Sequence, residues 1–110
     1  MNELPIPLPV ERAIKKLGRD ISLARRRRHI SQQSLAERIG SSAITVRRLE
    51  HGDPRIPLKY VARALHVFGE LERLNLLLDT GADVIGMTLA NERLPKRIRS
   101  RKQTKEPGAL

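Results

Sequence analysis

The apolar positions of this chain recur at helical spacing over most of its length. The longest run lies between Val10 and Arg28 and places six residues on one helical face: Val10, Ala13, Ile14, Leu17, Ile21 and Ala24. Because glycine is a poor helix former, we expect Gly18 to bend or interrupt this helix. Four shorter segments have the same periodicity: residues 32–39, 43–50, 58–68 and 71–78. No β-branched alternation of useful length is present, so the pattern predicts an all-α fold with five helices.

The last two of these segments carry a surplus of apolar residues. In residues 58–68 the positions expected to face inward are Val61, Ala62, Leu65 and Phe68. Residues 71–78 contain five leucines, more than one buried helix face needs. Two explanations remain open: the surplus contacts a partner, most simply a second copy of the chain, or the helix is buried in its own core.

Proline and charge mark the two ends of the chain. Prolines alternate with other residues over residues 1–9, and we expect this spacing to exclude a helix and leave an extended or polyproline arm, docked or disordered. Residues 10–80 hold the predicted domain. In residues 81–110 a short apolar segment at 82–90 fits helix or strand, and residues 93–105 carry seven basic residues and no acidic one. Such a basic run is typical of an interaction tail, so this last segment is expected to serve dimerisation or partner binding.

The charge balance narrows the possible partners. The 110 residues include 22 Lys and Arg against 12 Asp and Glu, a net charge of +10, which attracts nucleic acid or acidic membranes. Two aromatic residues are too few for stacking on single strands. The chain has no cysteine, no apolar run of membrane-spanning length and no secretory signal at its N-terminus, so a cytoplasmic protein is expected. Its three histidines are scattered, without carboxylates at metal-ligand spacing, so we expect neither an enzyme nor a metal or cofactor site.

Residues 32–51 carry the pattern of two short helices joined by a tight turn. Ala36 offers the small side chain that a helix crossing needs, and Gly40 can adopt the positive φ of the turn. Ser31 and Ser42 each stand directly before a helical segment, where N-caps are found. Four apolar residues at helical spacing are expected to hold the two helices together: Leu35, Ile39, Val46 and Leu49. In a basic chain this combination is typical of a helix-turn-helix that reads DNA.

These residues resemble the Cro/phage-repressor-type (xenobiotic-response-element) helix-turn-helix family over about residues 17–70. The stretch LARRRRHISQQSLAERIGSSAITVRRLEHGD has the family's order of motifs. The continuation through DVIGMTLANERLPKRIR resembles HipB-like antitoxins, which bind their operator as dimers and hold a HipA-like Ser/Thr kinase toxin. One departure is His29, where the family usually has Gly; if φ is positive there, His29 is strained.

The resemblance makes residues 43–50 the recognition helix. Its inward residues are Val46 and Leu49, which leaves Ala43, Ile44, Arg47 and Arg48 on the outer face. An Arg fork matches the O6 and N7 acceptors of guanine, and the Ile44 tip suits a thymine methyl. By family docking, Ala43 and Ile44 approach the bases. Arg47 and Arg48 reach a base or a phosphate. For Arg47, a base contact and a phosphate contact are about equally expected.

Other residues are expected to contact the DNA backbone or to hold the scaffold. Gln32, which the family uses to anchor a phosphate and brace the recognition helix, is a backbone candidate, and so is Ser42. Lys59 is a weaker one, and Thr45 either bonds within its helix or reaches the backbone. The resemblance pairs Arg25 with Glu50 as a structural ion pair. It leaves residues 26–28 mainly as a solvated face.

Three functions remain open from the sequence. The first is a homodimeric repressor that is also the antitoxin of a kinase toxin, itself one chain or split into two. The second is a solitary repressor without a toxin. The third is an adaptor that binds a protein partner, with a basic tail for RNA or membrane. Because an adaptor does not need the residues of the recognition helix, double-stranded operator DNA is the expected partner.

Overall fold

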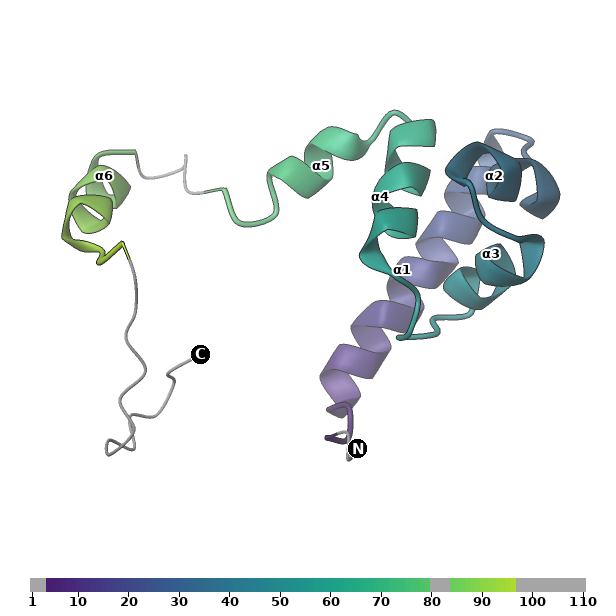
Figure 1. The fold of residues 1–110 in the computed structure, drawn as a ribbon, viewed down its shortest axis with the longest axis horizontal. Helices are drawn as coiled ribbons and strands as arrows, with labels where there is room; N and C mark the ends of the chain where they lie inside the picture. The colour runs from purple at the N-terminus through teal and green to yellow at the C-terminus, as the bar shows by residue number, and fades with distance from the viewer. Residues whose placement is uncertain (1–3, 80–83, 97–110) are drawn as a thin grey trace. The chain divides into compact units, whose positions relative to one another are not determined.

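The computed structural model describes residues 4–79 and 84–96, and the chain forms two compact units, Met1–Leu77 and Leu78–Leu110. The described residues contain helices and no strand, so the predicted all-α fold is confirmed (Figure 1). The helices of the first unit are α1 (Leu8–Arg27), α2 (Gln32–Ile39), α3 (Ala43–Glu50), α4 (Leu58–Val67) and α5 (Leu71–Asn75). The second unit holds α6 (Val84–Arg93).

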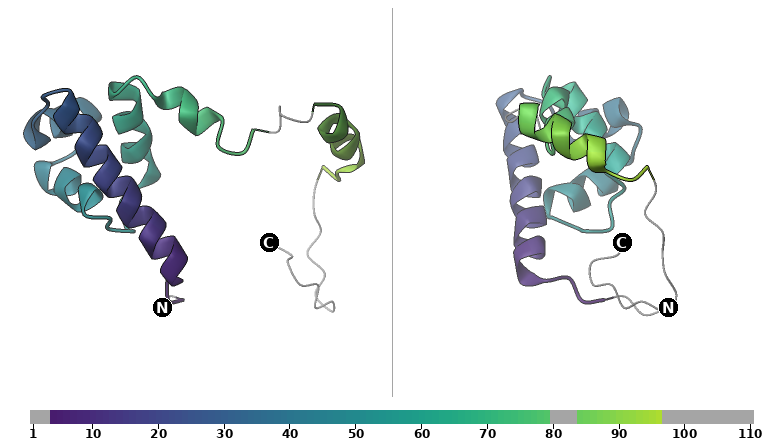
Figure 2. Two further views of the ribbon diagram at one scale, coloured as in Figure 1. Left: turned by 180° about the vertical axis from the view of Figure 1, so that it is seen from behind. Right: turned by 90° about the vertical axis from the view of Figure 1, so that its left-hand side faces the viewer.

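Helix α1 starts earlier and runs more continuously than the sequence predicts. It begins at Leu8, with Pro7 as its N-cap and Pro9 in its first turn. The expectation that no helix includes residues 1–9 is therefore wrong for Leu8 and Pro9. The backbone N–H groups of a first helical turn have no acceptor within the helix, so a proline there removes no hydrogen bond. The expected break at Gly18 is also wrong. The first turns of α1 extend beyond the neighbouring helices (Figure 2).

Gly18 is needed for close packing and does not act as a hinge. A Cβ at this position would lie 2.6 Å from the carbonyl oxygen of Leu49 and 2.8 Å from that of Glu50. Any larger residue would push α1 away from the end of α3. The glycine therefore lets α1 contact the backbone at the end of α3 directly.

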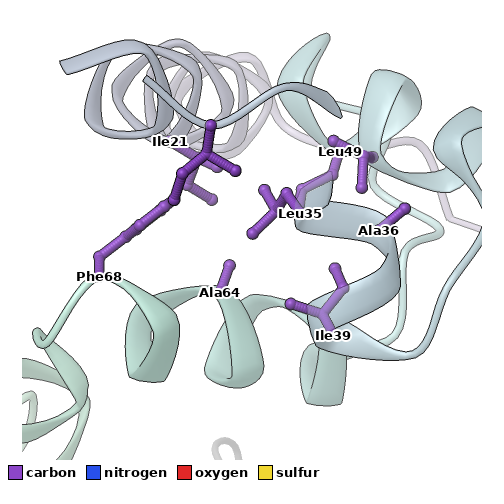
Figure 3. Close-up of a cluster of buried hydrophobic side chains, with 9 residues drawn as sticks. Ile21, Leu35, Ala36, Ile39, Leu49, Ala64 and Phe68 are labelled. Carbon is purple, nitrogen blue, oxygen red and sulfur yellow. The ribbon is translucent and has the colours of Figure 1, made fainter. Parts of the chain in front are cut away.

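The core lies where α1, α2, α3 and α4 meet (Figure 3). Leu35, Ile39 and Val46 are its largest fully buried side chains, and Ala36 fills a site with no room for more. Ala64 is the residue of α4 that packs at the centre, with 0% exposure. The predicted inward set on this helix holds for Phe68, which is buried, and for Val61, which is partly buried and packs against the core. It is corrected for Ala62 and Leu65, which are partly buried outside that cluster, and for Ala64, which was not predicted.

The turns between the helices follow local capping rules. Ser31 accepts a hydrogen bond from the backbone of Ser34, and Ser42 accepts one from the backbone of Thr45. Gly40 closes α2 with a φ of 73°. His29 has a φ of 56°. The backbone therefore has the positive φ for which the family usually has glycine at this position, although the residue here is a histidine.

The C-terminal part of the chain buries much less. Helix α5 ends at Asn75, three residues before the predicted end, and the leucines that follow it are exposed. Residues 84–90 belong to helix α6. The sequence alone fitted either a helix or a strand there. The part of the basic run 93–105 that follows Lys96 lies outside the described residues. Residues 80–83, at the expected domain boundary, also lie outside them.

Candidate nucleic-acid interface

Helix α3 has one buried and one exposed face. Val46, Leu49 and Glu50 are buried against the other helices. The opposite face carries Ile44, whose residue is 52% exposed, with Arg47 and Arg48 beside it. Ala43, expected on the outer face, is partly buried and packs against the core, so the expectation is corrected for this residue. An exposed isoleucine beside two cations on a well-packed helix is a surface suited to base edges and phosphates.

The N-terminus of α3 is closed by two hydroxyl groups. Ser42 Oγ lies 3.1 Å from the backbone nitrogen of Thr45 and 3.1 Å from its Oγ1. The Thr45 hydroxyl therefore has a partner within the first turn of the helix, and its remaining positions can still bond a group outside the helix. Ser42 is exposed, and its hydroxyl has one hydrogen-bonding position left beyond these two contacts.

Gln32 connects the first residue of α2 to the last residue of α3. Its Nε2 donates to Glu50 Oε1 at 3.0 Å, and the side chain is partly buried. The amide therefore braces α3, as the family resemblance implies for this position. The acceptor, Glu50, lies 18 positions away and was not identified from the sequence.

An ion pair joins α1 to the end of α3. Arg25 Nε donates to Glu50 Oε2 at 2.6 Å and Arg25 Nη2 donates to Glu50 Oε1 at 3.0 Å, so the guanidinium grips the carboxylate with two nitrogens. Arg25 Nη1 also donates to the carbonyl of Ile30 at 2.8 Å. Burial alone would raise the pKa of Glu50, but the hydrogen bonds from Arg25 and Gln32 outweigh it and hold the pKa below its usual value.

Two further arginines have structural contacts that the sequence did not indicate. Arg28, expected on a solvated face, donates to the carbonyl of Phe68 at 3.0 Å and lies 5.0 Å from the centre of its ring. Arg28 is exposed, as expected, but it also has these structural contacts. Arg63 donates to the carbonyl of Ile39 at 3.1 Å and so satisfies the end of α2.

Lys59 and its surroundings lie at the start of α4. Lys59 is exposed, with Nζ 5.1 Å from the centre of the Tyr60 ring. Just before α4, Arg55 pairs with Asp53, and this pairing lowers the pKa of the Asp53 carboxyl to about 2. Lys59 is thus a cation on the solvent side of this turn, and it keeps its place among the backbone-contact candidates.

Other kinds of site find no support in the described part of the chain. Residues 4–79 and 84–96 contain no group of three or more His, Cys, Asp or Glu side chains able to hold a metal ion. None of the helices described is long and apolar enough to cross a membrane.

The match to a protein family covers the region that holds these features. The family described as "Helix-turn-helix" matches residues 21–76, just over half of the chain. No curated protein and no solved structure matches the chain significantly. The match includes the whole of α2, α3 and α4, and with them the exposed face of α3. The chain therefore belongs to the helix-turn-helix family of DNA-binding proteins.

Proposed function

We propose that this protein is a transcriptional repressor that reads a double-stranded operator with α3. The observation that carries the proposal is the contrast between the two faces of this helix. Val46 is completely buried, whereas Ile44 is half exposed and Arg47 and Arg48 face solvent. A helix held rigidly by one face and offering cations and an apolar tip on the other has the form needed for the major groove.

Each exposed residue of α3 has a separate role in this proposal. Arg48 reads a base, by donating two hydrogen bonds to guanine, and Ile44 contacts a thymine methyl. Ala43 allows the helix end to approach the bases closely, and Arg47 contacts a base or a phosphate. The hydroxyls of Ser42 and Thr45, the amide of Gln32 and the ammonium of Lys59 are proposed to contact the DNA backbone.

The buried polar cluster supports this reading by fixing the orientation of α3. Glu50 accepts hydrogen bonds from Arg25 on α1 and from Gln32 on α2, so the last residue of the recognition helix is tied to both neighbours. Base contacts are sensitive to small displacements of the helix. Because α3 is already held in place, the free-energy cost of ordering it on binding is lower. Glu50 and Arg25 are therefore proposed as scaffold and not as direct contacts.

The proposal includes a homodimer, because the end of the first unit offers both projecting and recessed apolar surface. Leu77 is 71% exposed, while Leu17, Leu58, Val61 and Phe68 line a groove of about 530 Å³ that Leu77 also borders. Both charge signs occur on its rim, with Asp20 and Glu70 beside three arginines. A two-fold interface needs such self-complementarity, and it would place two copies of α3 about 34 Å apart, one turn of DNA.

A finer form of the proposal is an autoregulating, HipB-like antitoxin of a type II toxin–antitoxin module. It is supported by the resemblance of residues 84–99 to that subgroup and by α6, a helix beyond the matched family region. In this form the unit after Leu77 contributes to the dimer or binds a HipA-like kinase toxin, in one chain or split. A solitary repressor and a protein-binding adaptor remain the alternatives, and capture of a kinase encoded beside the gene separates them from the antitoxin.

Selection of duplexes from a random library by the full-length protein tests the proposal. We expect enrichment of an inverted repeat whose half-sites lie about one helical turn apart. Ile44→Ala should change the preferred base at one position of each half-site, while Lys16→Ala, on the exposed side of α1, should leave the preference unchanged. Recovery of sequences without a common motif would contradict operator reading.

A further inference from the structure

A second cationic surface lies beside the recognition helix. It is a cleft of about 780 Å³ between α1, the start of α2 and the end of α3. Lys15, Arg19 and Arg26 line it from α1, and Gln32 and His51 line it from the other two helices. No local sequence pattern indicates this cleft, because it depends on how α1 crosses the end of α3.

Helix geometry explains why these cations share one side of α1. Their spacings of four and seven residues bring Lys15, Arg19 and Arg26 onto one face. Two close approaches hold that face against the end of α3. One is the contact of Gly18 described above, and in the other a Cβ on Gly52 would lie 2.7 Å from Lys15 Cα. The backbone of α1 is thus fixed beside His51, while its long cationic side chains remain exposed.

The cleft carries more positive than negative charge. No salt bridge of residues 4–79 and 84–96 involves Lys15, Arg19 or Arg26, although the pKa of Asp20, lowered mainly by Lys16, is also lowered by the charge of Arg19. The only acidic residue lining the cleft is Glu50, which is buried and already bonded to Arg25 and Gln32. Lys16, one position away on α1, is different because it pairs with Asp20 at 2.6 Å. Unpaired cations around a spent carboxylate form a site for an external polyanion.

We propose that this cleft holds phosphates of the same operator duplex whose bases α3 reads, as a second backbone contact supplied by α1. The inference rests on the proposed function. His51 follows Arg47 by four residues and Ile44 by seven, so it continues the exposed side of α3 and joins the reading face to the cleft. His51 Nδ1 bonds the carbonyl of Arg47 at 2.8 Å, which leaves Nε2 directed away from the helix end.

The length of the cationic row favours a nucleic-acid backbone over a single small anion. From Lys15 to Arg26 the helix rises about 16 Å, at 1.5 Å per residue. One DNA strand carries a phosphate every 3.4 Å along its axis, so the row can follow roughly four phosphates. A free phosphate or sulfate would engage only one end of it.

The test compares two double variants of the full-length protein on the selected operator duplex. Lys15→Gln with Arg19→Gln removes two cations from the cleft. Arg12→Gln with Lys16→Gln removes the same two residue types, also four apart on α1, from positions that do not line it. Fluorescence anisotropy at several salt concentrations gives affinity and salt slope, and circular dichroism checks that both variants melt like the wild type.

We expect the cleft variant to lose two phosphate contacts. The slope of log K against log[salt] should become shallower by about 2 per protomer, and affinity at 0.1 M salt should fall roughly 60-fold per protomer, since each contact contributes about 0.9 to the slope. The preferred sequence should not change. Ethylation of individual phosphates should interfere with binding of the wild type at a cluster of positions. In the cleft variant only, this interference should disappear. Exchange of the two cations, Lys15→Arg with Arg19→Lys, should restore the slope.

The outcomes separate this inference from the function on which it rests. If wild-type protein binds the selected duplex while the cleft variant keeps its affinity and slope, the cleft holds no phosphate and operator reading stands. An equal loss in the Arg12 and Lys16 variant would also overturn the inference, because the effect would be one of net charge. If the wild-type protein binds no duplex selectively, the proposed function fails, and the inference fails with it.

Discussion

Residues 8–68 and the described residues 71–79 and 84–96 contain similar kinds of apolar side chain but use them differently. In the first region, Leu35 and Ala64 have no exposed surface, and α2 and α3 bury the apolar residues that face the core: Ala36, Ile39, Val46 and Leu49. In the second, α5 has no buried residue, and Leu78 is 92% exposed. Burial of a leucine is worth about 1.5–3 kcal/mol, so the first region stabilises itself, whereas the leucines of the second gain little until a partner covers them.

The largest expected effect is a difference between two identical substitutions, one in each region. Leu35→Ala should lower the free energy of unfolding by about 4 kcal/mol, because it leaves a cavity among α1, α2 and α3. Leu77→Ala should change the unfolding of the monomer by less than about 0.5 kcal/mol and should weaken self-association. Denaturant melts at low concentration and sedimentation at high concentration measure both. Similar losses of monomer stability would contradict the division into a self-sufficient and a partner-dependent region.

The next effect concerns the polar centre of the first region. Glu50→Ala should lower the free energy of unfolding by about 3 kcal/mol, because it leaves the Arg25 guanidinium buried and unpaired. Asp53→Ala removes a carboxylate from the exposed Arg55 instead and should lower the stability much less, because solvent screens this pair. Thermal melts of both variants provide the comparison. Equal melting temperatures for Glu50→Ala and the wild type would refute the structural role of this pair.

The same cluster predicts a pH dependence. Because the folded-state pKa of Glu50 lies below its unfolded value of 4.5, its contribution is fully present above that pH. It should be lost as the pH falls through the lower, folded-state pKa. Melting temperatures measured from pH 7 down to pH 3 should therefore decline, and Glu50→Gln should flatten the part of the decline below pH 4.5. An unchanged acid profile in Glu50→Gln would contradict this assignment.

A smaller effect is expected at the reading face. Arg48→Ala should weaken binding to the selected operator by about 1–3 kcal/mol if Arg48 reads a base. The loss of discrimination should be confined to one base pair, at which substitutions should no longer change the affinity. Binding isotherms on a set of single-substitution duplexes measure this. A loss of the same size on every duplex would instead assign Arg48 to a phosphate.

The smallest effect on folding, and the sharpest test of the second region, is truncation after Thr80. The helices of the first unit should form and melt as before, because their core lies between residues 21 and 68. On the proposed antitoxin function, dimer stability, capture of a kinase toxin or both should be lost, and DNA affinity should fall because two linked half-sites gain from effective concentration. Ultracentrifugation measures dimer stability, and pull-down with any kinase encoded beside the gene measures capture. A truncated chain that still dimerises and captures the kinase would make residues 81–110 a solvated extension only.

The features predicted well from the sequence are those that depend on neighbouring residues. Helices α2 and α3 begin and end where expected, because Ser31, Gly40 and Ser42 fix their ends through contacts within three or four residues. Their inward faces follow from helical periodicity alone. The exposed residues of α3 were identifiable for the same reason.

The features that were missed depend on how distant segments meet. Gly18 is explained only by the carbonyl groups of α3 against it, and Ala64 is central only because α4 crosses the core at that point. The start of α1 was misplaced because proline's effect depends on its position within the helix. The Lys15 and Arg19 cleft requires the crossing of α1 and α3, which no local spacing encodes.

The most direct test of operator reading by α3 is a titration of the selected duplex and of a scrambled duplex over a range of salt concentrations. If each protomer of a dimer neutralises about four phosphates, the slope of log K against log[salt] should be near −7, at about −0.9 per phosphate. The selected duplex should bind at least about a thousand times more tightly than the scrambled one at physiological salt. Equal affinity for the two duplexes, or affinity that does not change with salt, would contradict the account.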